Sequence, residues 1–237
     1  KKFLDNSKNG VMYMSVVSNV QSKDVSPQVQ KIVLNVFSEF NYNFVWKFEA
    51  EKLQGIPSNL LISKWLPQAD LLAHPNMKLF ITQGGQQSME EAIDRTIPMI
   101  IIPFLGDQEP NAKRMVMKKI GLHLDLQDLT EEKLRNSINE MLKPEYKENI
   151  IKLRELVNDQ PMTSREKAVW WTEYVIRHKG TKHLEYHGKD IPLYHRYFLD
   201  FAAIAIIFLL ILTKFIVSTY RRLFGKNPKD DKKTKMQ

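Results

Sequence analysis

The chain has 237 residues, of which 43% are hydrophobic, so it is long enough to bury a core in one or two domains. It contains no cysteine, which excludes disulfides and cysteine-ligated metal sites. The formal net charge is +8, but the segment from Lys214 to the C-terminus holds eight basic residues against two acidic ones. The rest of the chain is close to neutral, and a nucleic-acid-binding surface is therefore not expected.

The first 160 residues alternate apolar runs with amphipathic segments. Ser26 and Pro27, for example, are typical of a helix start, as N-cap and first helical residue. Such alternation predicts an α/β fold with a Rossmann-like parallel sheet, whose ligand binds outside the carboxyl ends of the strands. The predicted strands are Gly10–Val17, Asn43–Glu49, Leu60–Ser63, Leu79–Thr82 and Met99–Pro103, and the predicted helices are 27–40, 111–121, 130–142 and 146–158.

Residues 197–220 contain the most apolar segment. Residues 201–213 carry no charge, and extension to Tyr197 and Val217 gives the length that a hydrocarbon core of about 30 Å requires. Aromatic residues precede the segment and basic residues follow it, so we expect a transmembrane helix with a cytoplasmic tail. A buried or interfacial helix is the alternative. The expected parts are a ligand-binding domain (1–178), a membrane-proximal linker (179–196), a transmembrane helix (197–217) and a basic tail (218–237).

Three loops at predicted strand ends carry chemically useful side chains. They read "KWLPQADLLAHP", "QGGQQSMEEA" and "FLGDQEPNAKR". The pair Gly84-Gly85 before a helix is suited to a phosphate, because the first N–H groups of the helix and its dipole favour an anion. A plain structural turn explains the pair equally well when it is taken alone. Together the loops offer an aromatic face, amides, a hydroxyl group and carboxylates, which a base, a ribose, a diphosphate and a second sugar would use.

The motifs "WLPQ", "FITQGGQQSMEEA", "IPMIIIPFLGDQ" and "NAKRM" follow one another between Trp65 and Met115. In order and spacing they resemble the donor-binding signature of the UDP-glycosyltransferases, of the membrane-bound animal type that includes UDP-glucuronosyl- and UDP-glucosyltransferases. The resemblance implies a GT-B fold, in which two Rossmann-like domains face a cleft, and it makes this chain the C-terminal, donor-binding half. It extends to "GVMYMS", to Asp200 and to the basic tail.

The resemblance implies a UDP-sugar site of ten residues. Trp65 would stack on the uracil ring, because its flat aromatic face suits a planar base. Gln68 would bond on the ribose side, where the Glu91 carboxylate would accept hydrogen bonds from hydroxyl groups. The diphosphate would be held by Gln83, Gly84, Gly85, Gln87 and Ser88. The hydroxyl groups of the transferred sugar would be bound by Asp107 and Gln108.

Each of these residues taken singly has a plainer explanation. Trp65 is explained as a core or interface residue and Glu91 as part of a solvated helix face. Asp107 is explained by a turn and Ser88 by a helix cap. It is their joint register that favours the donor site.

Three positions depart from the family pattern. Gln83 stands where most relatives have His, so its amide can donate to a phosphate but cannot become cationic. Gln87 stands where many relatives have the shorter Asn. Val17 stands where relatives have Gly, and a β-branched side chain there would crowd the ligand, which puts a contact from Ser15–Ser18 in doubt.

The resemblance places the catalytic base, a His oriented by an Asp, and most of the acceptor pocket in an N-terminal domain. None of the six histidines has the context of that base. We therefore expect a C-terminal half that binds UDP-sugar as co-substrate, without a further cofactor or metal, and does not catalyse alone. The expected partners are the donor, a small lipophilic acceptor, the membrane and the N-terminal domain.

Lys233 and Lys235 resemble a dilysine signal, which agrees with a detoxifying enzyme of the endoplasmic reticulum membrane with a lumenal donor domain. A basic stop-transfer flank is the alternative for the tail. Two other functions stay open. One is a non-catalytic, membrane-anchored subunit that binds nucleotide-sugar. The other is a dinucleotide-dependent oxidoreductase, suggested only by the strand–glycine–helix joint, although Gly84-Gly85 lacks the G-x-G-x-x-G spacing.

Overall fold

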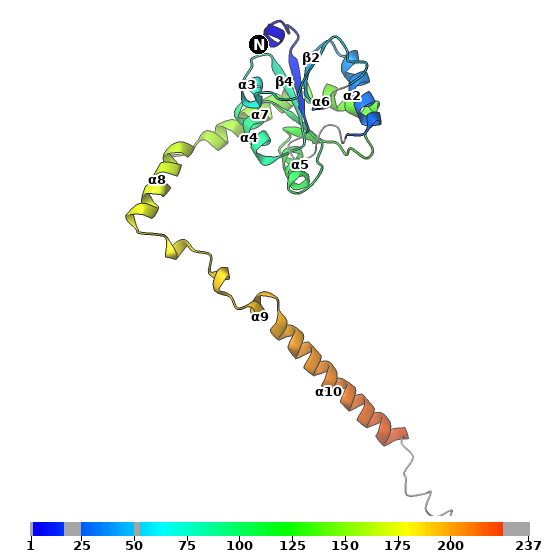
Figure 1. Ribbon diagram of the computed structural model, residues 1–237, viewed down its shortest axis with the longest axis vertical. Helices are drawn as coiled ribbons and strands as arrows, with labels where there is room; N and C mark the ends of the chain where they lie inside the picture. Colours follow the sequence, from blue (N-terminus) through cyan, green and yellow to red (C-terminus); the bar gives the residue numbers. More distant parts are fainter. Residues whose placement is uncertain (1, 17–24, 50–52, 225–237) are drawn as a thin grey trace, which may run out of the picture. The chain divides into compact units, whose positions relative to one another are not determined.

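The structure is a computed structural model that describes residues 2–16, 25–49 and 53–224 (Figure 1). The chain divides into two compact units, Lys1–Thr163 and Ser164–Gln237. Residues 164–178, which the sequence assigned to the ligand-binding domain, belong to the second unit, and the domain bounds given above stay a prediction.

The first unit is built on a six-stranded sheet with the strand order β3-β2-β1-β4-β5-β6. Every neighbouring pair of strands is parallel, which confirms the predicted fold class. The order reverses between β1 and β4, and a crevice for ligands opens at such a reversal, outside the carboxyl ends of the strands. The strands are β1 (Val11–Ser15), β2 (Asn43–Lys47), β3 (Leu60–Ser63), β4 (Met77–Thr82), β5 (Met99–Ile101) and β6 (Gly121–His123).

Helices cover both faces of this sheet. Figure 1 shows α2 (Pro27–Glu39) and α6 (Glu131–Met141) to one side of the strands, and α3 (Gln68–Leu72), α4 (Gln86–Asp94) and α7 (Pro144–Asn158) to the other. The remaining helices of the unit are α1 (Lys2–Asp5) and α5 (Gln108–Met117).

Two hydrophobic clusters result, one on each face of the sheet, and successive residues of a strand alternate between them. Met12 and Met14 of β1 join the cluster of Phe37, whereas Val11 and Tyr13 join that of Phe80. All five residues of β1 are buried, as expected for a central strand covered on both faces.

Side-chain caps fix where two of the helices begin. Ser26 Oγ accepts a hydrogen bond from Val29 N at 3.3 Å, and Pro27 follows as the first helical residue, which confirms the predicted start of α2. Thr130 Oγ1 accepts from Lys133 N at 3.2 Å at the start of α6. These caps satisfy N–H groups that have no partner inside the helix.

The predicted helix 111–121 is wrong at both ends. Helix α5 begins at Gln108 and ends at Met117, and the chain then forms the short edge strand β6. A Cβ atom on Gly121 would lie 2.8 Å from Ile101 Cδ1 and 3.0 Å from Met99 O, so this glycine allows β6 to pair closely with β5. A strand of three residues has too little apolar alternation to be detected in the sequence.

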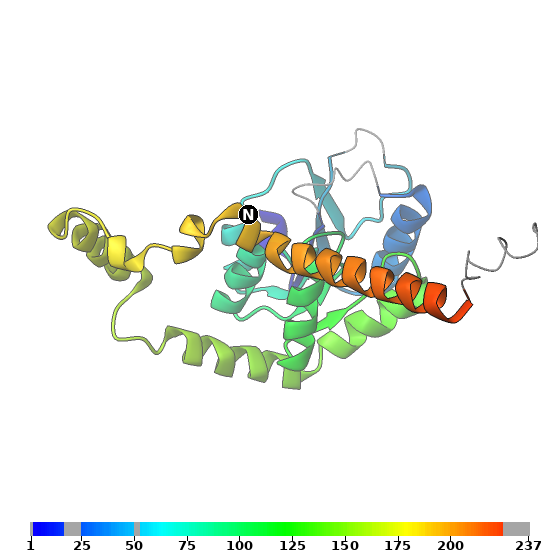
Figure 2. The ribbon, with the colours of Figure 1, turned by 90° about the horizontal axis from the view of Figure 1, so that it is seen from below.

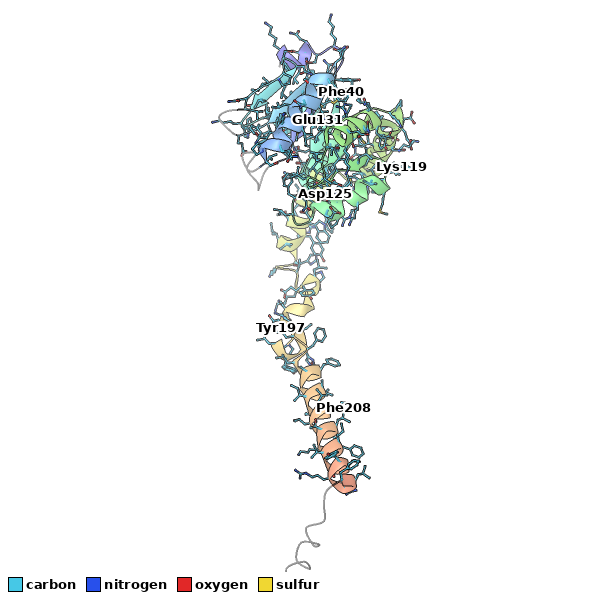
Figure 3. All side chains as sticks on the ribbon, turned by 90° about the vertical axis from the view of Figure 1, so that its right-hand side faces the viewer. Phe40, Lys119, Asp125, Glu131, Tyr197 and Phe208 are labelled. Atoms are coloured by element: carbon cyan, nitrogen blue, oxygen red, sulfur yellow. The ribbon has the colours of Figure 1, made fainter. Side chains whose placement is uncertain are left out.

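The second unit contains one long apolar helix, α10 (Leu199–Phe224), preceded by α8 (Ser164–Arg177), two 3₁₀ turns and α9 (Leu193–Arg196). Helix α10 has a mean hydropathy of 2.6 and none of its apolar window is buried. Figure 2 draws it as one unbroken helix, and Figure 3 shows side chains such as Phe208 projecting outward from it. Its length and composition are sufficient to cross a membrane, and the predicted apolar C-terminal helix is confirmed.

Asn59 provides a test of how the sheet edge is held. Its Nδ2 atom donates to Phe37 O at 2.8 Å, Phe40 O at 3.1 Å and Tyr42 O at 2.9 Å. We expect Asn59→Asp to lower the free energy of unfolding by at least about 2 kcal/mol, because a carboxylate would face three carbonyl oxygens. Urea denaturation of the detergent-solubilised chain measures this loss.

A matched control for that substitution is Asn9→Asp. Asn9 Nδ2 makes one exposed bond to Asn41 O at 2.9 Å, so its replacement should cost less than about 0.5 kcal/mol. Equal losses for the two variants would contradict the role assigned to Asn59.

Candidate functional site

The turn after β4 is where the sheet meets the candidate site. Gly84 has a φ of +87°, and a Cβ atom there would lie 2.6 Å from Ile101 Cγ2. Its carbonyl oxygen accepts a hydrogen bond from Asn111 Nδ2 at 3.0 Å, which ties the turn to α5. Both the backbone conformation and the lack of space require a glycine at position 84.

Gly85 is different, since nothing in the described part of the chain requires a glycine there. Its φ of −62° and ψ of 138° are open to any residue, and the nearest heavy atom to an added Cβ is Gln83 Nε2 at an ordinary 3.7 Å. Gly85 is the N-cap residue of α4, and no side chain caps that helix. The first turn of α4 therefore presents free N–H groups beside an open backbone position, which suits an anion.

Gln83 lies directly before this turn and is only 8% exposed. Its Oε1 atom is buried without a hydrogen-bond partner among the described residues. An unpaired buried acceptor costs roughly 1–3 kcal/mol, so the joint between β4 and α4 holds an unsatisfied polar atom beside the free helix terminus.

Gln68, the first residue of α3, bonds two other predicted site residues, Ser88 and Glu91. Its Nε2 atom donates to Ser88 Oγ at 3.0 Å and to Glu91 Oε2 at 2.8 Å, and its Oε1 atom accepts from the Tyr13 hydroxyl group at 3.4 Å. The structure thus brings Gln68 together with Ser88 in the first turn of α4 and Glu91 about one turn further along.

Tyr13 is the buried end of this network. The residue is fully buried and stacks on Phe80, with ring centroids 5.1 Å apart. The pKa of Tyr13 is raised to about 12, chiefly by burial; a hydrogen bond with Ser15 lowers it and the nearby Glu91 carboxylate raises it by smaller amounts. The hydroxyl group is therefore neutral at physiological pH and able to donate.

Asp107 and Gln108 start helix α5 and are linked to the glycine turn. Asn111 Nδ2 bonds both Gly84 O and Asp107 Oδ2, the latter at 2.9 Å. Gln108 is 4% exposed, and its Oε1 atom accepts from Phe104 N at 2.7 Å and Leu105 N at 3.1 Å. Gln108 therefore already holds the loop after β5, and its amide oxygen is not free for a ligand.

The other predicted residues lie at the surface or outside the described chain. Trp65 is 72% exposed, on the connection between β3 and α3, and its carbonyl oxygen accepts from Ser63 Oγ at 2.8 Å. Gln87 is exposed in the first turn of α4. Val17, the position expected to crowd the ligand, lies outside the described residues.

Two residues of the site were not predicted. Tyr13 looked like an ordinary apolar strand residue, and only the strand partnership with β4 reveals where its hydroxyl group lies. Asn111 stands in the "NAKRM" motif, but its role as a link between Gly84 and Asp107 requires the helix start at Gln108, which the sequence did not indicate.

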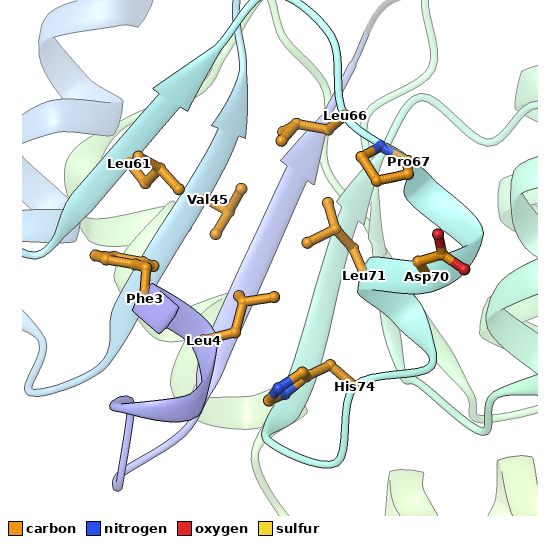
Figure 4. A pocket seen from close by; sticks show the side chains of 9 residues that line it. All are labelled: Phe3, Leu4, Val45, Leu61, Leu66, Pro67, Asp70, Leu71 and His74. Atoms are coloured by element: carbon orange, nitrogen blue, oxygen red, sulfur yellow. The ribbon is translucent and has the colours of Figure 1, made fainter. Parts of the chain in front are cut away.

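A separate apolar pocket of about 430 Å³ lies over β2 and β3 (Figure 4). Its polar groups are Asp70 and His74, and His74 Nε2 contacts Asp5 Oδ1 at 3.1 Å. None of the ten predicted donor-site residues is among the described residues that line it: Phe3, Leu4, Val45, Leu61, Leu66, Pro67, Asp70, Leu71 and His74. This pocket offers few groups to a diphosphate.

Comparison with known proteins gives a consistent result along the chain. The sequence model of a family described as "UDP-glucoronosyl and UDP-glucosyl transferase" matches residues 1–233. The chain is 38% identical to the UDP-glycosyltransferase UGT5 of Dactylopius coccus, over 92% of this chain and 41% of that protein. It is 34% identical to human UDP-glucuronosyltransferase 2B15, over 97% of this chain and 44% of that protein. The chain thus spans less than half the length of these curated relatives.

Solved structures show the same fold. A UDP-glucose:anthocyanidin 3-O-glucosyltransferase in complex with UDP matches with a TM-score of 0.60 at 24% identity, over 68% of this chain and 39% of that one. Os79 from O. sativa, in complex with UDP and deoxynivalenol-3-glucoside, matches with a TM-score of 0.56 at 22% identity, over 65% of this chain and 39% of that one.

The two glycines allow a direct test of the turn. We expect Gly84→Ala to lower the free energy of unfolding by about 2–4 kcal/mol, because the new methyl group meets Ile101 and the backbone needs a positive φ. Gly85→Ala should cost less than about 1 kcal/mol, since only its N-cap preference changes. Denaturant titration of both variants measures the difference, and similar losses would contradict the distinction.

Proposed function

Because the chain belongs to the UDP-glucuronosyl and UDP-glucosyl transferase family, we propose that its first unit binds the nucleotide-sugar donor of a UDP-glycosyltransferase reaction. The proposed reaction transfers a hexosyl or glucuronosyl group from UDP to a small lipophilic acceptor. One observation carries the assignment of the donor site. The uncapped first turn of α4 opens beside Gly85, and Gln68 holds Ser88 of that turn together with Glu91 one turn further along.

The diphosphate is assigned to the N-terminus of α4. The free N–H groups of the first turn and the helix dipole favour an anion, and Gly85 leaves the approach open. Gln83 and Gln87 supply amides and Ser88 a hydroxyl group close to this turn. The buried Oε1 atom of Gln83 cannot bond a phosphate oxygen, since both are acceptors, so the Nε2 group of this residue is the one assigned to the ligand.

The uridine is assigned to Trp65 and Glu91, with Gln68 on the ribose side. The exposed indole of Trp65 offers a stacking face for the base. Gln68 occupies only one carboxylate oxygen of Glu91, so the other can accept from a ribose hydroxyl group. The transferred sugar is assigned to Asp107 and to the amide nitrogen of Gln108, whose oxygen already bonds the β5 loop.

Catalysis is assigned to the part of the family's length that this chain does not span. A His base and the acceptor pocket are proposed to lie there, and the donor half alone is proposed to bind without catalysing. UDP-sugar serves as co-substrate in this proposal, with no other cofactor. The family resemblance, rather than a contact in this chain, supports these assignments.

Helix α10 is proposed to anchor the protein in the endoplasmic reticulum membrane, with the donor domain lumenal. Its 26 residues correspond to about 39 Å of helix, more than the roughly 30 Å of a hydrocarbon core. Tyr194 and Tyr197 precede it, and Arg221 and Arg222 lie in its last turn, in keeping with a cytoplasmic basic flank.

Calorimetric titration of UDP into the full chain in detergent tests the donor site. We expect saturable binding and a dissociation constant about 5- to 150-fold higher for Trp65→Ala, because loss of base stacking costs about 1–3 kcal/mol. Trp170→Ala in α8 is the matched control, as it removes a half-exposed tryptophan of the second unit. The absence of UDP binding by the folded chain would contradict the proposal.

Gly85→Ala tests the place of the diphosphate separately from that of the base. A methyl group at this position would project into the space assigned to phosphate, so we expect UDP affinity to fall about tenfold. Uridine, which has no phosphate, should bind the variant and the original chain equally well. If UDP affinity is unchanged, the diphosphate does not approach the N-terminus of α4.

A further inference from the structure

We infer that Tyr13 is a positioning residue for the ribose end of the donor site. In this inference, which rests on the proposed function, the Tyr13 hydroxyl group orients the Gln68 amide. That amide in turn holds Ser88 and Glu91 in place for the ribose. Tyr13 itself makes no contact with the ligand.

The hydrogen-bonding capacity of the Gln68 side chain supports this role. A primary amide has two N–H donors and one carbonyl acceptor. The two donors are used on Ser88 Oγ and Glu91 Oε2, and the carbonyl oxygen faces the Tyr13 hydroxyl group. A rotated amide would place its oxygen against the Glu91 carboxylate, where two acceptors would repel each other.

Tyr13 is suited to orienting this amide because it cannot move easily. Its ring is fully buried in β1 and stacks on Phe80 of β4 with an interplanar angle of 5°. The hydrogen-bond network therefore begins at Tyr13 in the central strand β1 and ends on α4, which follows β4. The strand order reverses between β1 and β4, so the network crosses that point.

The consequence for the ligand is that Glu91 and Ser88 are held before the donor arrives. Among the described residues no partner bonds Oε1 of Glu91 or takes the hydroxyl proton of Ser88, so both are available to a ligand. Groups fixed in advance lose less conformational freedom on binding, so affinity for a ribose improves without a new contact.

Tyr13→Phe removes the hydroxyl group and keeps the stacked ring. The bond it deletes is long, at 3.4 Å, so a modest effect is expected. We expect affinity for UDP to fall about threefold and affinity for 2′-deoxy-UDP to stay unchanged, so that the preference for the ribonucleotide falls by the same factor. Calorimetry on the full chain in detergent provides both dissociation constants, and a thermal melt checks that the variant is folded.

Tyr146→Phe is the matched control. Tyr146 also bonds a glutamate through its hydroxyl group, Glu140 Oε1 at 3.2 Å, but it lies in α7 away from the donor residues. Neither nucleotide should bind this control differently. A second comparison uses Gln68→Ala, which should lower the ribonucleotide preference at least as far. Adding Tyr13→Phe to Gln68→Ala should change nothing more, because Tyr13 acts through Gln68.

The outcomes separate the inference from the proposed function. An original chain that binds UDP with a ribonucleotide preference that Tyr13→Phe leaves intact would overturn the inference alone. Equal weakening of both nucleotides, or a full additional loss in the Gln68→Ala background, would also overturn it. An original chain without ribonucleotide preference would show that the pre-positioned Glu91 does not bind the 2′-hydroxyl group, and would refute the inference. A folded chain that binds neither nucleotide would overturn the proposed function as well.

Discussion

The close approach of Gly84 to Ile101 is the constraint on which the site depends. With no side chain, Gly84 lets the chain leave β4 over β5 and turn into α4 at a positive φ. Asn111 then fixes the turn by bonding its carbonyl oxygen, and the same amide group holds Asp107 at the start of α5. Two helix N-termini are thereby placed at one edge of the sheet. A bulkier residue at position 84 would move both of them.

Polarity in the site is divided between groups that hold the structure and groups that remain available. Gln68 and Gln108 are both glutamines at helix starts, and the amide oxygen of each accepts hydrogen bonds within the protein. Gln68 accepts from Tyr13, and Gln108 accepts from the loop after β5. Glu91 and Asp107 are carboxylates with one oxygen bonded by an amide. The carboxylates therefore keep an acceptor for ligand hydroxyl groups, whereas the glutamines chiefly position them.

Much of this fold followed from the sequence because its strong signals are local. The five apolar strands, the cap at Ser26 and the apolar C-terminal helix depend on short-range patterns, and the structure contains all of them. Strand β6 and the start of α5 were missed because their cause is tertiary. Gly121 makes β6 possible by close packing on β5, and Gln108 starts a helix only where its side chain can bond the preceding loop.

The donor-site residues were predicted as a set through motif spacing, but spacing cannot say which of them touch each other. Gln68 lies 20 residues before Ser88 and 23 before Glu91, and only the β3-α3-β4 crossover brings them into contact. Tyr13 is further still, 55 residues from Gln68, and enters because β1 pairs with β4. Long-range pairing of this kind is set by the sheet order, which a local pattern does not encode.

Two groups at the site carry an energetic cost, and donor binding relieves only one of them. Trp65 has 72% of its surface exposed, and the buried Oε1 atom of Gln83 has no donor among the described residues. A stacked base would remove apolar surface from water at Trp65. At Gln83 the oxygen needs an N–H or O–H group, which a diphosphate anion does not have. The partner of this oxygen must therefore be a hydroxyl group, a water molecule or another part of the protein. In this respect Gln83 differs from the N–H groups of α4, which donate to an anion directly.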